Sequence, residues 1–460
     1  MHNRELSERS LKAVWHPCTQ MKVHQTLPLV PVARAEGIWL YDYEGNRYLD
    51  AISCWWVNLF GHGDRRINAA LKEQIEKLEH VMLAGFTHEP VIELSERLSA
   101  RTGNRLGHCF YASDGASAIE IALKMSFHYW RNTGQPEKRQ FVALQNGYHG
   151  ETAGALSVTD VALFRDAYGP LLRESAIVPS PDWRRAAPGE SPRDFALRCA
   201  ESLEDYLRSH HQTTAAFVIE PLVQCAAGMA MYHPEYLQCA RSICDRYGVH
   251  LIADEIAVGF GRTGTFFACE QAGVNADFLC LSKGITGGYL PLSVVLTTDH
   301  VFEAFYSDDV ERAFLHSHSY SGNALACRAA LATLAIFDEN SVIETNRRTA
   351  EKLTEAANGL AAHRYVKDFR HTGMIWAFDV DSPDPRFSRR FYAAALNNGL
   401  LLRPLGNTVY FMPPYIINDS DIEFLVTRTL QTLDALGSAD VAVNSELHPP
   451  VAHNILDALR

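Results

Sequence analysis

The chain lacks long apolar runs, long basic runs and a basic leader. No apolar run in its 460 residues reaches membrane-spanning length, and the first residues, up to Glu8, carry acids where a secretory signal would be basic and then apolar. We therefore expect a cytoplasmic protein without a membrane segment. The net charge of −12, from 42 Lys and Arg against 54 Asp and Glu, disfavours nucleic acid and anionic membranes as partners. A small-molecule substrate fits better.

Paired cysteine motifs are also missing. The ten cysteines are scattered, and no two have C-x-x-C spacing. This favours reduced, mostly buried thiols over disulfides or zinc. His316 and His318 superficially offer a pair of metal ligands, but no matching Cys, Asp or Glu cluster accompanies them in the sequence. Metal binding is therefore disfavoured, and no metal site is expected.

Short apolar runs alternate with amphipathic helical stretches through the middle of the chain. This alternation is typical of the α/β class, in which a mostly parallel sheet is covered by helices. A hairpin is expected between Gly37 and Asp50, and the proline-rich stretch 179–193 is expected to be a surface loop. Strands are expected at Cys109–Ala112, Gln140–Leu144, Ala216–Glu220, His250–Asp254, Phe278–Leu281 and Leu292–Leu296.

The length and the hydrophobic content of 47% allow a large core and more than one domain. We expect residues 1–60 to form an N-terminal segment that packs with the C-terminal part. Residues 61–330 would form a large cofactor-binding domain, and residues 331–437 a smaller α+β domain. The pattern from Ala324 to about Asn358 is strongly helical and is expected to lead into the smaller domain. The tail, 438–460, carries weak order signals.

Chemically capable residues follow several of the expected strands. In open α/β sheets, ligands bind beyond the carboxyl ends of the strands, so Glu220, Asp254 and Lys283 would converge there. A lysine and a carboxylate on neighbouring strands can serve the two ends of one pyridine ring. The amine holds an aldehyde as a Schiff base, and the acid keeps the ring nitrogen protonated. The pattern therefore points to pyridoxal phosphate.

Two glycine-containing loops could hold the rest of such a cofactor. Gly115 and Ala116 begin a helical pattern after a strand, where free amides and the helix dipole suit a phosphate. An ordinary capped helix start would explain them as well. Tyr148 and His149 lie between glycines after another strand. Tyr148 could stack on a flat cofactor, or it could be the buried tyrosine of a glycine-rich turn.

Two tryptophans and an arginine stand out elsewhere. Trp55 and Trp56 are adjacent, and on an extended segment they would point to opposite faces, one into the core and one into a pocket. Packing of both in the core is the alternative. Arg403 could clamp a substrate carboxylate with its planar fork, or it could form a surface ion pair.

Taken together, these segments resemble the class III, fold-type I pyridoxal-phosphate aminotransferases. The likeness runs from about Trp15 to Tyr415. It rests on the ordered motifs Gly115-Ala116, Tyr148-His149-Gly150, Glu220-Pro221, Asp254-Glu255, Ser282-Lys283-Gly284 and Gly322-Asn323. The resemblance implies a large domain with a mostly parallel sheet, a smaller α+β domain, and a homodimer with shared active sites.

The resemblance also implies roles in holding the cofactor. Lys283 would bind it covalently and shuttle the proton, Asp254 would pair with the ring nitrogen, and Tyr148 would stack on the ring. The amides of Gly115 and Ala116 would hold the phosphate.

The resemblance implies further roles for residues outside these loops and strand ends. Ser319 would donate to the phosphate from the neighbouring subunit, and Arg403 would bind the carboxylate of the amino acceptor. Trp55 and Trp56 would shape the pocket for both substrates, and Gly322 would border it.

Within the family, one branch acts in biotin synthesis. Three segments of this chain resemble that branch: Trp15-His16-Pro17, Ser53-Cys54-Trp55-Trp56 and Arg403-Pro404. That branch converts 8-amino-7-oxononanoate to 7,8-diaminononanoate in a ping-pong reaction, with S-adenosyl-L-methionine as donor. Cys18 stands where the branch often has tyrosine, so lysine stays open as the donor.

Three other functions stay open. One is a class III transaminase for β-alanine, ornithine or an ω-amine, acting with pyruvate or 2-oxoglutarate. Another is an aminomutase, which would share the cofactor site. The third is a regulatory module that binds the cofactor without turnover, and the intact set of Lys283, Asp254 and Arg403 argues against it.

Overall fold

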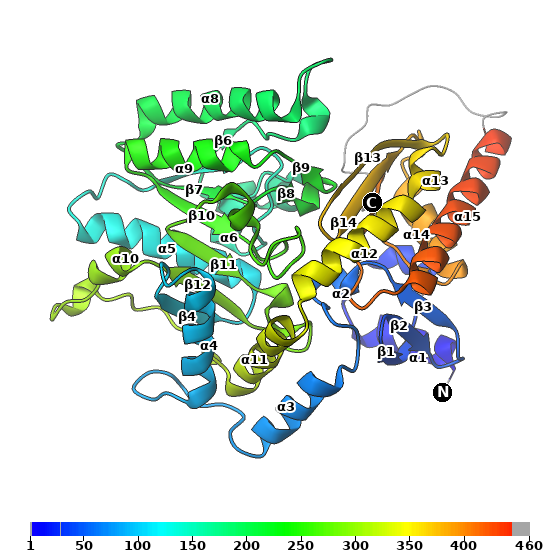
Figure 1. The fold of residues 1–460 in the computed structure, drawn as a ribbon, viewed down its shortest axis with the longest axis horizontal. Coiled ribbons are helices and arrows are strands. Elements are labelled where there is room, and N and C mark those ends of the chain that lie inside the picture. Colours follow the sequence, from blue (N-terminus) through cyan, green and yellow to red (C-terminus); the bar gives the residue numbers. More distant parts are fainter. Residues whose placement is uncertain (1, 28, 444–460) are drawn as a thin grey trace. The chain divides into compact units, whose positions relative to one another are not determined.

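The computed structural model describes residues 2–27 and 29–443, which fall into two compact units (Figure 1). The central unit is Arg65–Ile343. The terminal unit combines the chain up to Asp64 with the chain from Glu344 onward. The finer domain boundaries expected at residues 60, 330 and 437 remain a prediction. Of the expected tail, helix α15 (Asp419–Val443) includes the first residues, and 444–460 lie outside the described residues.

A seven-stranded sheet forms the core of the central unit. Only β12 runs antiparallel to its neighbours, so the sheet is mostly parallel, as expected. All six expected strands are present, and β6 is an additional edge strand. The order is β4 (His108–Ala112), β12 (Ser293–Thr297), β11 (Phe278–Leu281), β10 (His250–Asp254), β7 (Thr214–Ile219), β5 (Gln140–Leu144) and β6 (Ala176–Val178).

Helices cover both faces of this sheet. Helix α5 (Gly115–Asn132) lies on one face, while α8 (Pro192–His210) and α9 (Glu235–Tyr247) pack together over the other (Figure 1). The apolar spacing of α5 explains its place, because Ile119, Ala122 and Ile121 are fully buried against the strands. The helices α3 (Arg65–Ile75) and α4 (Glu89–Arg101) both pack against α11 (Ala324–Glu339). No helix of the described residues is long and apolar enough to cross a membrane.

Short elements complete the central unit. They are α6 (Ala153–Ser157), α7 (Ala162–Arg165), α10 (Asp299–Glu303), the hairpin β8 (Val223–Gln224) with β9 (Ala230–Met231), and the 3-10 turns η2 (Asp166–Leu171), η3 (Trp183–Arg185), η4 (Cys225–Ala227), η5 (Ala268–Ala272), η6 (Lys283–Thr286) and η7 (Val310–Arg312).

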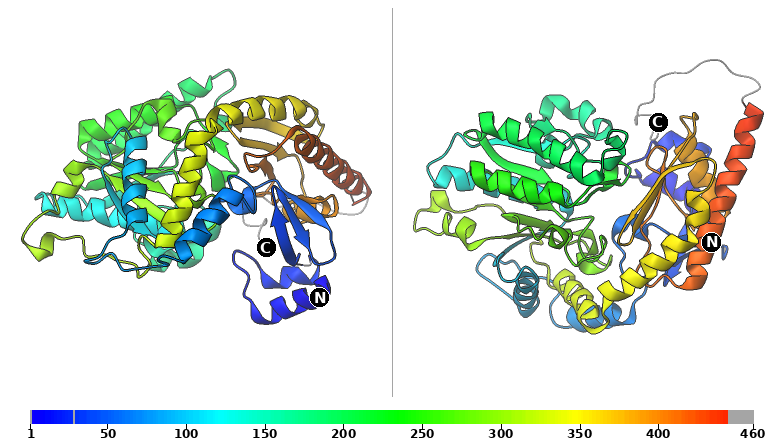
Figure 2. Two further views of the ribbon diagram at one scale, coloured as in Figure 1. Left: turned by 60° about the horizontal axis from the view of Figure 1, so that its bottom comes forward. Right: turned by 45° about the horizontal axis from the view of Figure 1, so that its top comes forward.

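The terminal unit contains two small sheets. The first has the order β1 (Val32–Glu36), β2 (Trp39–Asp42), β3 (Arg47–Asp50) and β15 (Leu400–Leu401), and its antiparallel β2–β3 pair is the expected hairpin. The second has the order β13 (Val366–Thr372), β14 (Ile375–Val380) and β16 (Thr408–Phe411). Its other elements are α1 (Asn3–Ala13), η1 (Met21–Gln25), α2 (Ser53–Trp56), α12 (Val342–Ala356), α13 (Asn358–Ala361), α14 (Phe387–Asn397) and α15. Helices α14 and α15 lie side by side (Figure 2).

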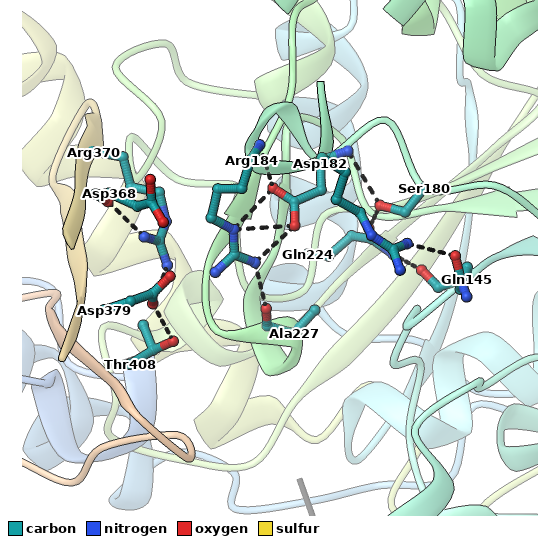
Figure 3. Close-up of polar contacts among 11 residues, drawn as sticks. Gln145, Ser180, Asp182, Arg184, Gln224, Ala227, Asp368, Arg370, Asp379 and Thr408 are labelled. Atoms are coloured by element: carbon teal, nitrogen blue, oxygen red, sulfur yellow. Dashed lines mark hydrogen bonds and ion pairs between the residues drawn. The ribbon is translucent and has the colours of Figure 1, made fainter. Parts of the chain in front are cut away.

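A buried arginine ties the three strands of the second sheet together. Arg370 is 5% exposed and donates from Nη1 to the Asp368 carbonyl at 2.7 Å and from Nη2 to Asp379 Oδ1 at 3.1 Å (Figure 3). Thr408 on β16 donates to the same carboxylate oxygen at 2.6 Å. The pairing satisfies a charge that would be costly to bury alone.

The stretch from Ala324 to about Asn358, expected to be strongly helical, is helical in the structure and forms two helices with a break between them. Helix α11 ends at Glu339, and α12 begins at Val342. Between them Ser341 adopts a φ of 47°, a left-handed conformation that an α-helix cannot continue through. The apolar periodicity could not reveal the break because it resumes at once.

Candidate functional site

The chemically capable residues of the central unit come together at one edge of its sheet. Strands β7, β10 and β11 are adjacent and parallel, and Asp254 pairs with Cys280 in the register. Asp254 ends β10, Glu220 follows β7 directly, and Lys283 follows β11 after Ser282. All three therefore lie at the carboxyl edge, which is the usual ligand-binding side of an open α/β sheet.

Asp254 is held at both carboxylate oxygens. The side chain is nearly fully buried; Oδ2 lies 2.7 Å from His149 Nδ1, and Oδ1 accepts from the amide of Ile256 at 3.1 Å. Burial by itself lowers the pKa of His149. The hydrogen bond and charge of Asp254, with the charge of Glu220, outweigh that effect and raise the pKa above its usual value. A buried carboxylate so fixed can stabilise positive charge on a ligand atom beside it.

Glu220 anchors the loop that carries Tyr148. Its Oε1 accepts from the Tyr148 amide at 3.0 Å, and its Oε2 accepts from the Cys225 amide at 3.1 Å. Burial raises the pKa of this carboxyl to about 7, with the His149 charge opposing and the Asp254 charge adding to the rise. Glu220 therefore lies in one buried group of interacting side chains with His149 and Asp254.

Lys283 has the properties that a proton-shuttling amine needs. Burial lowers its pKa, although Cys225, Asp254 and Glu220 act in the opposite direction. A lowered pKa increases the fraction of neutral amine, the form that can act as a base or nucleophile. The backbone of Lys283 has a φ of 43°, and left-handed conformations of this kind gather at functional sites.

The start of α5 provides a closely packed loop with available amides. Asp114 caps the helix by accepting from the Ser117 amide at 2.9 Å, while Gly115 and Ala116 occupy the first helical positions, whose amides have no partner within a helix. A Cβ added to Gly150 would lie 2.5 Å from the Cβ of Ala116. Small residues are therefore required on both sides, as expected where a ligand phosphate approaches a backbone.

Tyr148 is half-buried in the loop after β5. Its hydroxyl donates to Glu151 Oε1 at 3.0 Å, and its ring centroid lies 5.3 Å from that of Phe164. The ring is therefore positioned from two sides while part of its surface stays accessible. This leaves room for the stacking role expected of it.

The stretch 179–193, expected to be a surface loop, is buried at its start. Ser180 and Asp182 are 2% and 7% exposed, so the expectation is wrong there. Arg184 explains the burial, because its Nη2 donates to Asp182 Oδ2 at 2.8 Å and to the Ala227 carbonyl at 3.1 Å (Figure 3). Prolines signalled an irregular backbone, and irregular backbone can be buried when it is hydrogen-bonded.

The same network braces the loop that carries Tyr148. Ser180 donates to the side chain of Gln224, and Gln224 Nε2 donates to the carbonyl of Gln145 at 3.0 Å (Figure 3). Because Gln145 is the first residue after β5, the network fixes the start of the loop.

The donor set of the central unit fits pyridoxal phosphate. A buried carboxylate held at both oxygens suits a protonated ring nitrogen, and a lysine with a lowered pKa suits an aldehyde. The first amides of α5, flanked by residues that cannot be enlarged, suit a phosphate.

The terminal unit holds a second group of expected site residues. The guanidinium carbon of Arg403 lies 5.1 Å from the centre of the Trp55 ring, and its Nη2 donates to the Cys18 carbonyl at 3.1 Å. Trp55 is 41% exposed. Trp56 is 5% exposed and donates from Nε1 to the Tyr410 hydroxyl at 3.1 Å. The two tryptophans thus differ sharply in environment.

The segment that carries both tryptophans is not extended, so that expectation is wrong. Residues Ser53, Cys54, Trp55 and Trp56 have φ values of 52°, 46°, 70° and 76°, which form a left-handed turn. Each such residue costs on the order of 1–2 kcal/mol. Nothing in the apolar pattern signals a turn of this hand.

Ser319 and Gly322 lie in the segment before α11. Ser319 is exposed, and its carbonyl lies 2.8 Å from His80 Nε2. Gly322 has a φ of 62°, and its carbonyl lies 2.8 Å from His88 Nε2. Within one chain, no contact described for Ser319 joins it to the start of α5; the expected role of its hydroxyl concerns a neighbouring subunit.

Two residues matter more than the sequence pattern indicated. His149 is the hydrogen-bonding partner of Asp254, and Glu220 fixes the loop of Tyr148. Glu220 directly follows an apolar strand, and His149 lies between glycines. These are the sequence signals that could have identified them.

These features define a fold-type I pyridoxal-phosphate-dependent transferase. Residues 20–433 match the family described as aminotransferase class-III, and the chain belongs to this family. It is an enzyme that uses pyridoxal phosphate and acts on small molecules.

Named relatives cover nearly the whole chain. It is 46% identical over 438 residues to the adenosylmethionine-8-amino-7-oxononanoate aminotransferase of Helicobacter pylori, covering 94% of this chain and 98% of the relative. The crystal structure of the enzyme of that name from Methanocaldococcus jannaschii is 32% identical, with a TM-score of 0.89 and coverage of 94% and 99%. An amine transaminase from an uncultivated Pseudomonas species, solved with pyridoxal phosphate bound, is 30% identical, with a TM-score of 0.87 and coverage of 92% and 98%.

Proposed function

We propose that the protein transfers an amino group from S-adenosyl-L-methionine to 8-amino-7-oxononanoate and so makes 7,8-diaminononanoate for biotin synthesis. The observation that carries this proposal is the 46% identity to a relative of that name across 98% of the relative's length. The residues of both units agree with it. Lys283 and Asp254 provide the chemistry of transamination, and Arg403 provides a cation for the acceptor carboxylate.

Each residue of the sheet edge has a task in this reaction. The bound cofactor supplies an electron sink for the carbon that loses or gains the amino group. Lys283 Nζ accepts the proton from the amine-bearing carbon of the donor, and it later delivers a proton to the former ketone carbon of the acceptor. Asp254, held by His149, keeps a positive charge at the ring nitrogen favourable. Tyr148 covers one face of the ring.

Arg403 is suited to hold the acceptor carboxylate in place. Its guanidinium is partly exposed, always charged, and oriented by the Trp55 ring and the Cys18 carbonyl. A bidentate pair with a carboxylate would fix the distance between that end of the substrate and its ketone. Trp55 would offer an apolar surface to the hydrocarbon chain of the substrate. A role in shaping the same pocket is expected of Trp56 as well, and because Trp56 is 5% exposed it would act by supporting the turn from within the core.

The assembly and location that accompany this function are part of the proposal. The protein would act as a homodimer in the cytoplasm, with Ser319 of one subunit reaching the phosphate site of the other. The exposure of Ser319 agrees with such a contact. Sedimentation measurements and the loss of cofactor affinity in Ser319→Ala test it.

Separate half-reactions test the function most simply. Adding S-adenosyl-L-methionine alone to the cofactor-loaded enzyme should remove the visible absorbance, and adding 8-amino-7-oxononanoate should restore it. Lysine as donor in a parallel sample decides the donor, because Cys18 replaces the tyrosine expected there. No loss of absorbance with either donor, or recovery with pyruvate but not with 8-amino-7-oxononanoate, would contradict the proposal.

A general amine transaminase is the second candidate. It is favoured by the fold match to the amine transaminase from the Pseudomonas species, at 30% identity and a TM-score of 0.87. That function predicts loss of absorbance with simple ω-amines and recovery with pyruvate, without a requirement for a carboxylate at the position of Arg403.

A further inference from the structure

Three potential metal ligands meet beside the left-handed turn of the terminal unit. The ligand atoms of Asp50, Cys54 and His62 all lie within 4.8 Å of one another. His62 Nε2 is 3.3 Å from Asp50 Oδ2 and 3.8 Å from Cys54 Sγ. The spacing is D-x₃-C-x₇-H, which a search for paired cysteines does not detect. None of these residues belongs to the site already described.

These distances match the edges of a tetrahedral zinc site. With Zn–N and Zn–O bonds of about 2.0 Å and a Zn–S bond of about 2.3 Å, tetrahedral angles place N and O about 3.3 Å apart and S and N about 3.5 Å apart. The observed separations are 3.3 Å and 3.8 Å. Because the three ligand atoms all lie within 4.8 Å of one another, one ion can reach all three after local side-chain movements, and a fourth position stays open for water.

The charge at the cluster also favours a cation. The Asp50 side chain is fully buried, and no lysine or arginine in the described part of the chain forms an ion pair with it. Its Oδ1 accepts from the Cys54 amide at 2.9 Å, and Oδ2 faces the His62 ring. A buried carboxylate without a fixed positive partner is costly, and a divalent ion would offset that cost.

The second ring nitrogen of His62 has a group that can set the required tautomer. Asn58 Nδ2 lies 3.3 Å from His62 Nδ1. Rotation of this amide by half a turn exchanges its nitrogen and oxygen, which have nearly the same shape. The oxygen then accepts a hydrogen bond from Nδ1–H, and the Nε2 lone pair becomes available to a metal, as in many histidine ligands.

Two of the three ligands lie on regular backbone, and the third lies in a strained turn between them. Asp50 ends β3, and the His62 amide donates to the Gly37 carbonyl at 2.6 Å, whereas Cys54 lies within the left-handed turn, at a φ of 46°. A bond from Cys54 to an ion shared with Asp50 and His62 would hold the turn from both sides. The His62 side chain is 19% exposed, which gives an ion a path from solvent.

We propose that Asp50, Cys54 and His62 form a divalent metal site, suited to zinc, that fastens the turn presenting Trp55. Binding forms the S–metal, N–metal and O–metal bonds and releases the Cys54 thiol proton to solvent. With Asp50 binding as a carboxylate and His62 as the neutral Nδ1–H tautomer, one proton would leave per ion. The sulfur and nitrogen ligands favour zinc over magnesium or calcium.

Cobalt(II) is a direct probe of this site in the full-length, cofactor-loaded protein. Tetrahedral cobalt with a thiolate ligand gives intense visible d–d bands, at longer wavelengths than the cofactor absorbs. We expect these bands to reach their maximum at one equivalent of cobalt per chain and to disappear when zinc is added. Absence of the bands would overturn the proposal.

Variants assign the signal to these residues. Cys54→Ser and His62→Ala should remove the bands, whereas Cys239→Ser, at a half-buried cysteine of the central unit, should leave them intact. Bands that persist in Cys54→Ser would place the ion elsewhere and contradict the proposal.

A measurement on the unmodified protein covers the case in which a variant fails to fold. Iodoacetamide labelling of Cys54, followed by mass spectrometry, should slow at least several-fold when one equivalent of zinc is present. Labelling of Cys239 in the same sample should not change. Equal rates at Cys54 with and without zinc would exclude the site.

Discussion

The two units of the protein hold the residues with proposed functional roles in opposite ways. In the central unit, Asp254 and Glu220 are buried at strand ends and fixed by backbone amides and His149. In the terminal unit, Trp55 is 41% exposed, and Arg403 is oriented by a ring and one carbonyl. The difference follows from the tasks. Shifted pKa values require burial and fixed partners, whereas substrate recognition requires a surface that a ligand can reach.

Removing the amine of the central unit should have the largest effect. Lys283→Ala should lower kcat by at least about 10²- to 10⁴-fold, the usual contribution of a positioned proton-transfer group, and loss of the covalent bond adds to that. Single-turnover absorbance with the donor measures it. Lys72→Ala, at an exposed lysine of α3, is the control and should retain activity. Equal rates for Lys283→Ala and the parent would remove Lys283 from the chemistry.

Neutralising Asp254 should have the next largest effect. Asp254→Asn keeps the size of the side chain but removes its charge, so kcat should fall by about 10²- to 10³-fold. The same change should lower the pKa of His149, because the hydrogen bond and charge of Asp254 are the main effects that raise it against burial. Nitrogen NMR of histidine-labelled protein across a pH series checks the direction. An unchanged pKa of His149 would show that the two side chains are not coupled.

The adjacent tryptophans provide a matched test within the terminal unit. Trp56→Ala should lower the free energy of unfolding by about 3–5 kcal/mol, because it leaves a cavity in the core. Trp55→Ala should lower it by about 1 kcal/mol or less, since the side chain is 41% exposed and its contact with Arg403 is a cation–π contact near the surface. Denaturant unfolding measures both. Similar losses in the two variants would contradict the assignment of one to the core and the other to the surface.

Arg403 should show the smallest and most selective effect. Arg403→Ala should lower kcat/KM for the acceptor by about 10- to 150-fold, the value of a charge-assisted hydrogen bond of about 1.5–3 kcal/mol. The half-reaction with the amino donor should change little, because the proposed clamp acts on the acceptor. Arg403→Lys keeps the charge but not the planar fork, so it should restore only part of the loss. An acceptor KM that does not respond would exclude the clamp.

The regular parts of the fold could be predicted because their signals are local. Apolar runs of strand length identified β5, β10 and β11 at their observed bounds, and the order of strands and helices gave the mostly parallel sheet. The residues at the strand ends then followed from the topology. β6 was missed because its three residues are too short to form a pattern.

The irregular parts could not be predicted because tertiary contacts determine them. The left-handed turn at Trp55 and Trp56 has no glycine, and its backbone is held by partners such as the Met412 carbonyl, which accepts from Ser53 Oγ at 2.7 Å and lies hundreds of residues away. The pairing of His149 with Asp254 also spans strands far apart in the sequence. Sequence spacing carries little information about such contacts.

Borohydride trapping tests the central claim most directly. The protein is incubated with pyridoxal phosphate, reduced, digested and analysed by mass spectrometry. The account predicts a single dominant covalent adduct on the peptide that contains Lys283, and its absence after pretreatment with an amino donor that removes the visible absorbance. An adduct on a different lysine, or no adduct at all, would contradict it.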